Sequence, residues 1–258
     1  MGLFIGCAGW NLRKEQAGLF DAVGTHLERY SARLSGVEIN SSFYRPHQRK
    51  TYERWAESTP AGFRFSVKVP KQITHERQLV DCEPLVERFA HEIAGLGPKL
   101  GPVLVQLPGT LAFDPAVAEN FFGLLQERLS IPTVCEPRHG TWFGDEADAL
   151  LVAQRVSRAA VDPALVLQAA DPRGWLQTCY FRWHGSPRMY FSAYDDHDLA
   201  RLAEMVAAWR SKAQDVWCIF DNTAMGAATL NALTLTDICQ ERGEAPTCSR
   251  EVDKANHE

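Results

Sequence analysis

The sequence predicts an α/β fold, specifically a closed (β/α)8 barrel of eight parallel strands in which the sixth helix is degraded. Eight strand-like segments alternate with helix-like segments along the chain, which is the pattern of a parallel barrel. The chain has 258 residues, and such a barrel needs roughly 250. An open doubly wound sheet is the alternative, but GCAGW after the first strand is not the GxGxxG of a dinucleotide site.

Apolar runs rich in β-branched and aromatic residues are expected to form the strands. They cover residues 3–7, 36–40, 63–69, 102–108, 132–137, 157–163, 178–185 and 215–222. The fourth run, PVLVQLP, is almost continuously apolar, as expected for a strand that is covered on both faces.

The segments between the strands carry apolar residues at helical spacing. Leu85, Phe89 and Ile93 form one stripe in 83–96, and Asp114 with Pro115 marks the start of another helix. Further helices are expected at 25–34, 52–59, 145–154, 197–212 and 227–239. The span 164–177 contains DPRG and lacks periodicity, so a degraded helix or an irregular loop is expected there. One barrel domain is predicted over 1–242, followed by a flexible polar tail over 243–258.

The composition indicates a soluble, cytoplasmic protein. The net charge is −5 and the pI about 5.9, whereas nonspecific nucleic-acid binders carry a basic excess; a local basic pocket stays compatible with this balance. The seven cysteines include no CxxC pair and are expected to be buried free thiols of a reducing compartment. The start MGLFIGCAGW resembles neither a signal peptide nor a membrane span, so no membrane partner is expected.

Polar residues at the ends of five apolar strands predict a single site. These ends lie in the segments 36–44, 63–70, 133–139, 180–185 and 217–224. A buried charge without a partner costs several kcal/mol, and the carboxyl ends of barrel strands meet in one mouth. We therefore expect the polar side chains to converge there.

Period-two alternation indicates which side chains face the mouth. Three pairs share a face near a strand end: Glu38 with Asn40, Glu136 with Arg138, and Arg182 with His184. The two glutamates come from strands across the barrel and are the expected acid and base. The alternative is that both are ion-paired to arginine or lysine and only hold the barrel top together.

The expected ligand is a small anion. Lys68, Arg138 and Arg182 place three cations around the mouth, and arginine forks suit carboxylate or phosphate groups. The predicted catalytic residues are Glu38, Glu136, Asp162 and His184. The predicted substrate-binding residues are Asn40, Lys68, Arg138, Arg182, Gly185, Tyr194 and Asn222.

Several of these residues have a structural alternative. His184 is also compatible with a metal-ligand role or with a hydrogen-bonded structural role, and Asp162 and Asp221 are compatible with capping the turn that follows each of them. Tyr194 belongs to a group of aromatic residues near the mouth that either stack on a ligand or plug the barrel.

A metal site is an open alternative, although no cofactor is assigned. His47, His75 and His139 lie in loops after strands two, three and five, where carboxylates are also present. No HxH or HExxH spacing supports such a site.

The motifs of the chain resemble a known family. The segments are GCAGW, VEINSSFY, FRFSVK with ITH, LVQLP, CEPRHGTW, FRWHG and CIFDNTAMGAATLNAL. They are similar to the YecE-like proteins, which are catalogued as a domain of unknown function. The resemblance implies a TIM-type barrel and supplies no reaction, because the family has no established activity.

The resemblance implies a set of motif positions. These are Glu38, Asn40, Lys68, Glu136, Arg138, Arg182, His184, Gly185 and Asn222. Two departures stand out: many relatives carry Asn-Asn where this chain has Asp221-Asn222, and this chain reads NLRKEQAGLF after GCAGW instead of aromatic residues.

Three functions are compatible with the sequence. The leading one is an enzyme that acts on a small phosphorylated or carboxylated, sugar-like substrate by carboxylate acid–base chemistry. The others are a metal-dependent phosphodiesterase or nuclease-like hydrolase, and a non-catalytic ligand-binding module.

Overall fold

A computed structural model describes residues 1–247 of the chain, in which strands alternate with helices. The strands are β1 (Gly2–Cys7), β2 (Gly36–Ile39), β3 (Arg64–Lys68), β4 (Leu100–Gln106), β5 (Thr133–Glu136), β6 (Val156–Arg158), β7 (Ala160–Asp162), β8 (Arg173–Gly174), β9 (Thr178–Trp183) and β10 (Asp215–Phe220). The α-helices are α1 (His26–Ser31), α2 (Ser41–Tyr44), α3 (Arg49–Glu57), α4 (Glu83–Ile93), α5 (Pro115–Arg128), α6 (Asp145–Ala153), α7 (Asp196–Arg210) and α8 (Ala227–Glu241).

The strands of the described chain form two sheets. Their orders are β1-β10-β9-β7 and β2-β3-β4-β5-β6-β8, and every pairing is parallel except that of β6 with the short β8. The predicted strand 157–163 is divided into β6 and β7 at Ala159. Because β6 pairs with β5 and β7 pairs with β9, this one segment joins the two sheets.

The predicted closed eight-stranded barrel is confirmed only as an α/β fold with parallel strands. Within residues 1–247 the sheets do not close into a barrel, since β1 and β2 share no backbone ladder. Hydroxyl groups take the place of the ladder. The amide of Cys7 donates to the Tyr30 hydroxyl (2.7 Å), which donates to the Gly36 carbonyl (3.1 Å), and the amide of Ile5 donates to Ser35 Oγ (2.8 Å).

Glycine is required where β1 approaches β2. A Cβ atom on Gly6 would lie 1.8 Å from the carbonyl oxygen of Gly36, which no side chain tolerates. The two strands therefore lie in direct contact although no ladder joins them.

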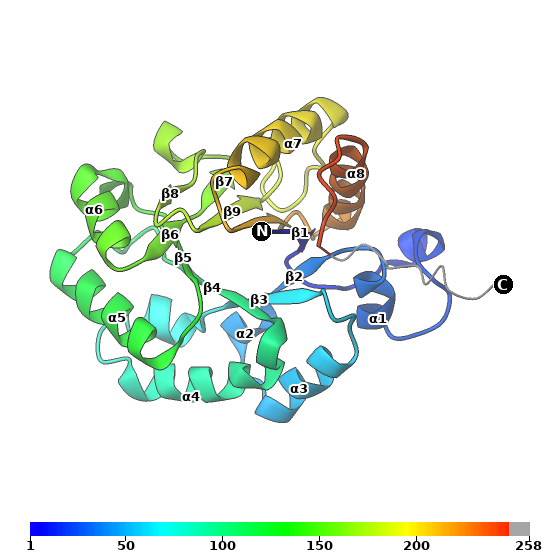
Figure 1. Cartoon of the computed structure of the whole chain (residues 1–258). Coiled ribbons are helices and arrows are strands. Elements are labelled where there is room, and N and C mark those ends of the chain that lie inside the picture. The colour runs from blue at the N-terminus through cyan, green and yellow to red at the C-terminus, as the bar shows by residue number, and fades with distance from the viewer. Residues whose placement is uncertain (248–258) are drawn as a thin grey trace.

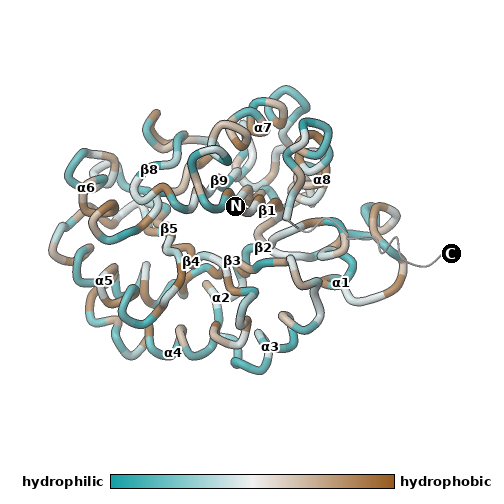
Figure 2. Tube along the Cα trace, viewed as in Figure 1, coloured by the Kyte–Doolittle hydropathy of each residue, from teal (hydrophilic) through white to brown (hydrophobic). Residues whose placement is uncertain are grey.

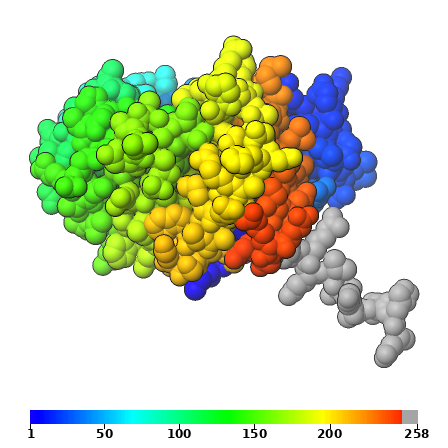
Figure 3. Space-filling view, turned by 90° about the horizontal axis from the view of Figure 1, so that it is seen from above, coloured from blue at the N-terminus to red at the C-terminus, as the bar shows by residue number. Residues whose placement is uncertain are grey.

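The helices lie outside the strands (Figure 1). In the view from above, α7 and α8 lie next to each other on one face (Figure 3), and they are in contact. The predicted cap of α5 is confirmed, because the Asp114 carboxylate accepts from the amides of Ala116 (3.0 Å) and Val117 (3.2 Å). The degraded sixth helix is also confirmed, since the described span 164–177 holds a 3-10 turn (Leu167–Ala169) and β8 but no α-helix.

The hydrophobic core has one part between strands and helices and another part on the inner side of the strands. Figure 2 shows hydrophilic residues along the outer turns of the helices. The inner part contains Phe4, Tyr180 and Trp217, whose rings stack with centroids 4.6 Å (Phe4–Trp217) and 6.1 Å (Tyr180–Trp217) apart. From this aromatic stack the Tyr180 hydroxyl reaches the carboxylate of Glu38.

The end of the described chain contacts β1. The Thr247 amide donates to the Leu3 carbonyl (3.0 Å), and the Leu3 amide donates to Thr247 Oγ1 (2.9 Å). The predicted flexible tail covers 243–258, of which 248–258 lie outside the described residues. The extent of the single domain, 1–242, stays a prediction.

The sequence predicted buried free thiols and no membrane-spanning segment. The six cysteines within the described residues are buried free thiols. No helix among residues 1–247 combines the length and the apolar character needed to cross a membrane.

Candidate functional site

Arg182 lies at the centre of a buried group of charges at the carboxyl ends of the strands. Its Nε and Nη2 donate to the two oxygens of Glu38 at 2.9 Å each, and its Nη1 donates to Glu136 Oε2 at 3.2 Å. Nη2 also lies 3.0 Å from Asp221 Oδ2. The side chains of Arg182, Glu38 and Glu136 are fully buried, so one guanidinium serves three carboxylates, two of which have no exposed surface.

Glu38 is committed to this network. Besides the bidentate pair with Arg182, its Oε2 lies 3.0 Å from the Tyr180 hydroxyl, which is in turn 3.0 Å from Ser66 Oγ. Both carboxylate oxygens therefore have partners. The predicted pairing of Glu38 with arginine is present, whereas its predicted role as acid or base stays a prediction.

Glu136 is ionised and shared among several donors. Its Oε1 accepts from Gln106 Nε2 (2.8 Å) and from Arg138 Nη2, and its Oε2 accepts from Arg182. Burial opposes ionisation of Glu136, but the guanidinium groups of Arg182 and Arg138 outweigh it and hold the pKa well below the usual range.

His184 connects the two ends of the network. Its Nε2 lies 2.7 Å from Arg138 Nη2, and a guanidinium can only donate, so Nε2 is the acceptor. The ring proton is therefore on Nδ1, which lies 3.0 Å from Asp221 Oδ2. The arrangement fixes the imidazole by a donor on one side and a carboxylate on the other.

Asp221 is the carboxylate of the network that reaches a pocket. Burial raises its pKa, but Arg182 and then His184 and Lys68 outweigh this effect, so the pKa lies below its usual value. Asp221 is 5% exposed and lines a pocket of about 600 Å³, whereas Glu38 and Glu136 do not line it. An ionised carboxylate thus faces the pocket.

Lys68 is the buried cation of this pocket, which we call the Lys68 pocket. It is the last residue of β3 and is 5% exposed, and its Nζ lies 4.1 Å from the centroid of the Phe43 ring. Burial lowers the pKa of Lys68 to about 8; the neighbouring Arg182 adds to this effect, and the carboxylates of the network oppose it. Within residues 1–247, the Nζ of Lys68 has no hydrogen-bond acceptor. No carboxylate oxygen of these residues lies within ion-pair distance of it.

The remaining predicted residues lie around this centre. Asn40 lines the pocket, and its buried Oδ1 has no hydrogen-bond partner within residues 1–247. Asn222 is fully buried, and its Nδ2 donates to the Ser192 carbonyl and to Asn231 Oδ1, at 2.9 Å each. Asn222 therefore fixes the surrounding loops.

Asp162, Gly185 and Tyr194 form a separate group. The Tyr194 hydroxyl donates to Asp162 Oδ1 (2.8 Å) and accepts from the Gly185 amide (2.9 Å). None of the three lines the Lys68 pocket. Gly185 has a φ of +98°, and a Cβ there would lie 2.8 Å from the Ser192 carbonyl oxygen, so its part in the site is conformational.

Gln106 is a site residue that the sequence reasoning missed. It ends β4, donates to Glu136 and lines the pocket. The available signal was a single amide at the carboxyl end of an otherwise apolar strand, LVQLP.

The histidines of the alternative metal site do not converge. His47 bonds to Ser41 Oγ (2.8 Å), His75 to Thr74 Oγ1 (2.9 Å) and His139 to Thr141 Oγ1 (2.9 Å). In the described part of the chain, ligand-type atoms gather at metal-binding spacing at Asp195, His197 and Asp198, near the start of α7. That group is away from the Lys68 pocket.

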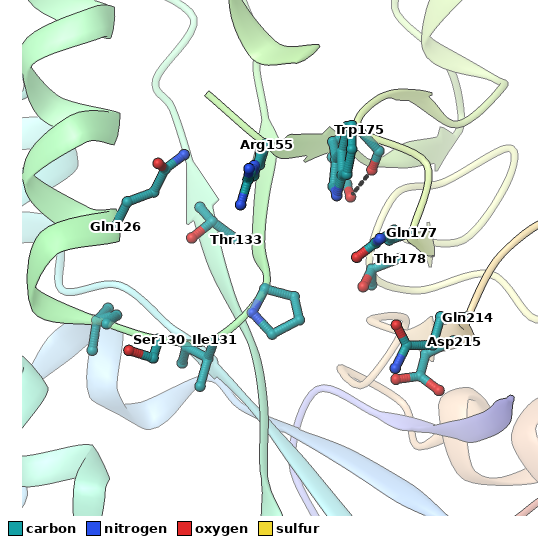
Figure 4. Close-up of a pocket in the computed structure, with 13 residues that line it drawn as sticks. Gln126, Ser130, Ile131, Thr133, Arg155, Trp175, Gln177, Thr178, Gln214 and Asp215 are labelled. Atoms are coloured by element: carbon teal, nitrogen blue, oxygen red, sulfur yellow. Dashed lines mark hydrogen bonds between the residues drawn. The ribbon is translucent and has the colours of Figure 1, made fainter. Parts of the chain in front are cut away.

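A second pocket lies at the opposite, amino ends of the strands. Its volume is about 400 Å³, and it is lined at the starts of β5, β9 and β10. Figure 4 shows the side chains of Gln126, Arg155, Thr133 and Gln177 around it. The polar groups of this second pocket are mainly amides and hydroxyls. The Lys68 pocket differs from it because buried charged side chains line the Lys68 pocket.

Two curated proteins are similar to this chain in sequence. The chain is 33% identical to the UPF0759 protein YecE of Escherichia coli K12 over 157 residues, which cover 57% of this chain and 56% of YecE. The match thus spans about half the length of YecE. The UPF0759 protein YunF of Bacillus subtilis 168 is 24% identical over 280 residues, which cover 95% of this chain and 98% of YunF.

Solved structures and a family model complete the comparison. A DUF72 family protein from Enterococcus faecalis V583 has a TM-score of 0.79 at 22% identity, covering 92% of this chain and 95% of that one. Another from Thermotoga maritima MSB8 has a TM-score of 0.76 at 20% identity, covering 93% and 100%. These identities show the fold alone. The family described as protein of unknown function DUF72 matches residues 4–256, so the resemblance to YecE-like proteins is confirmed and the chain belongs to this family.

Proposed function

We propose that the protein is an enzyme that binds a small anionic, sugar-like molecule in the Lys68 pocket and transfers a proton on it. The observation that carries the proposal is the buried ammonium of Lys68, which faces the pocket without an acceptor beside the ionised Asp221. The strands would act together as a (β/α)8 barrel whose mouth is this pocket, with the hydroxyl bridges between β1 and β2 in place of one ladder.

An anionic group on the ligand would supply what Lys68 lacks. Phosphate and carboxylate oxygens accept charge-assisted hydrogen bonds from an ammonium, and such bonds are stronger when buried. Arg182 and Arg138 already have carboxylate partners, so Lys68 is the cation of the network left for a ligand. The unpartnered Oδ1 of Asn40 and the amide of Gln106 would orient hydroxyl groups.

Asp221 would be the base of the reaction. It is ionised, it faces the pocket, and Nδ1 of His184 donates to it. Arg138 donates to the other side of the imidazole. In this proposal Glu38 and Glu136 act through Arg182 and His184 as positioning residues, which refines the carboxylate acid–base chemistry expected from the sequence.

The proposal is tested by binding and by proton exchange. Phosphorylated and carboxylated sugars are screened for an increase in melting temperature, and each hit is incubated in D2O and followed by NMR. Asp221→Asn should bind the hit but lose deuterium incorporation by about 10²–10⁴-fold. Asp215→Asn, at the opposite ends of the strands, is the matched control and should keep it.

Each outcome has a distinct meaning. Binding without exchange or product formation would show a non-catalytic binding module. Turnover only after addition of a divalent metal ion would favour the metal-dependent hydrolase. If no anionic compound raises the melting temperature, the proposed pocket function is wrong.

A further inference from the structure

Lys68 is held rigidly at a strand end. It pairs with Leu104 in the ladder between β3 and β4, and its carbonyl oxygen accepts from Ser42 Oγ at 2.6 Å. The side chain extends over the face of the Phe43 ring to the pocket. The position of Nζ is therefore defined by packing and does not depend on an ion pair.

Lys68 has no direct ion pair within residues 1–247. Arg182 contacts three carboxylates within 3.2 Å, and Arg138 contacts Glu136, whereas no carboxylate oxygen of the described residues lies within 4.0 Å of Lys68 Nζ. A buried ammonium without such a partner is costly to the fold. The surroundings therefore shift the side chain of Lys68 towards its neutral form.

The neutral amine is the nucleophilic form of lysine. With the pKa of Lys68 lowered to about 8, about 9% of the side chain is neutral at pH 7, against about 0.03% for an ordinary lysine. Desolvation beside another cation is a recognised way to activate a lysine, and Arg182 supplies that cation here.

We propose that Lys68 forms an imine with the carbonyl group of the substrate, which makes the substrate an anionic aldehyde, ketone or 2-oxo acid. This inference rests on the proposed function for the location of the ligand and adds its chemical class. It also gives Lys68 a covalent role in addition to electrostatic attraction.

The step balances without an oxidant or a reductant. The nitrogen lone pair attacks the carbonyl carbon, and the electrons of the C=O π bond move to oxygen. The two amine protons leave with this oxygen as water, and protonation of the imine nitrogen gives an iminium ion. The iminium then withdraws electrons from the adjacent carbon, from which Asp221, in the same pocket, accepts a proton.

Reductive trapping tests the imine. The full chain is incubated at pH 7 with pyruvate, glyceraldehyde 3-phosphate or uncharged glyceraldehyde, reduced with sodium cyanoborohydride, and analysed by intact mass and peptide mapping. We expect an adduct on Lys68 that forms at least about tenfold faster than the adduct on Lys71, and peptide mapping separates both from labelling of the N-terminal amine. Lys71 lines the same pocket but is 48% exposed and lies 3.1 Å from Glu76, which makes it the internal reference.

Two variants separate the covalent role from charge and folding. Lys68→Arg keeps the cation and should abolish the adduct while its melting temperature confirms a folded chain. Lys50→Arg, at an exposed position of α3 outside the pocket, should leave the adduct on Lys68 unchanged. An adduct that forms equally on surface lysines, or that persists in Lys68→Arg, would overturn the inference.

The outcomes distinguish this inference from the proposed function. Lactate and glycerol 3-phosphate are anions that carry no carbonyl. If they or the sugar hits raise the melting temperature while no carbonyl probe is trapped, the imine is wrong and the pocket function stands. If Lys68 is trapped but no deuterium exchange occurs, the imine stands and the proposed enzyme fails.

Discussion

Replacing Lys68 by methionine should stabilise the fold. Methionine keeps an unbranched chain of similar length and removes the charge. In the folded protein the pKa of Lys68 is lowered from its ordinary 10.5 to about 8, and each pH unit is worth 1.36 kcal/mol, so the buried charge costs about 3 kcal/mol at neutral pH. For a chain of this size that corresponds to a rise in melting temperature on the order of 10 °C.

The gain should depend on pH in a defined direction. Below pH 8 the folded and the unfolded chain both carry the proton, and the penalty is fully present. Between pH 8 and 10.5 the unfolded chain holds a proton that the folded chain has released, so the stability of the wild type rises with pH. The advantage of Lys68→Met should therefore be constant near pH 7 and vanish above pH 10.

Urea unfolding at several pH values between 6 and 10 measures this difference. Lys71→Met is the control: it removes the same charge from a half-exposed position and should change the free energy of unfolding by less than about 1 kcal/mol at every pH. A wild type as stable as Lys68→Met at pH 7, or a difference that does not change with pH, would refute the assigned burial of a charged amine.

Three further substitutions test the buried charge network around Arg182 and the contact between β1 and β2. Arg182→Met leaves buried carboxylates without their counter-ion and should cost about 3–5 kcal/mol in urea unfolding, while Arg201→Met, at a half-exposed site, should cost less than about 0.5 kcal/mol. The lowered pKa of Glu136 means that the folded chain resists protonation of this carboxylate, so the free energy of unfolding falls as the pH drops below about 4.5. Glu136→Gln should make this fall less steep, as measured by unfolding midpoints from pH 3 to 7. Gly6→Ala brings a Cβ against a backbone oxygen and should lower the free energy of unfolding by on the order of 3 kcal/mol. Gly18→Ala is the control, because its Cβ meets no atom within 4 Å. An equal loss of melting temperature in both variants would contradict the close contact of β1 and β2.

Local patterns were sufficient to predict most strands and helices. The continuous apolar run at 102–108 is β4, and the periodic segment at 83–96 contains α4, because burial imposes a period that is visible in one segment alone. The division of 157–163 into β6 and β7, and the missing ladder between β1 and β2, depend on neighbours far away in sequence. No local period carries that information.

The sequence predicted that charged residues converge at one end of the strands, but not how they are arranged there. Alternation indicated that Glu38, Glu136, Arg182 and His184 share one end of the strands, and the structure brings them together. Which charge is enclosed and which faces the pocket depends on side-chain reach and on how many partners one guanidinium can serve. The sequence therefore left the ion-paired alternative for Glu38 open. It also offered no reason to rank Asp221 above Glu38 as the candidate base.

The hydroxyl bridges between β1 and β2 give this junction a different way of opening from the other strand pairs. The amides of Ile5 and Cys7 depend on the Ser35 and Tyr30 side chains for protection from solvent. Because both side chains are buried, these amides should exchange only when the contact of β1 with the residues around β2 loosens, whereas amides paired with β10 exchange when β1 and β10 separate. Hydrogen exchange at Ile5 and Cys7 should therefore report local widening of this junction, which continues into the loops beside Asn40.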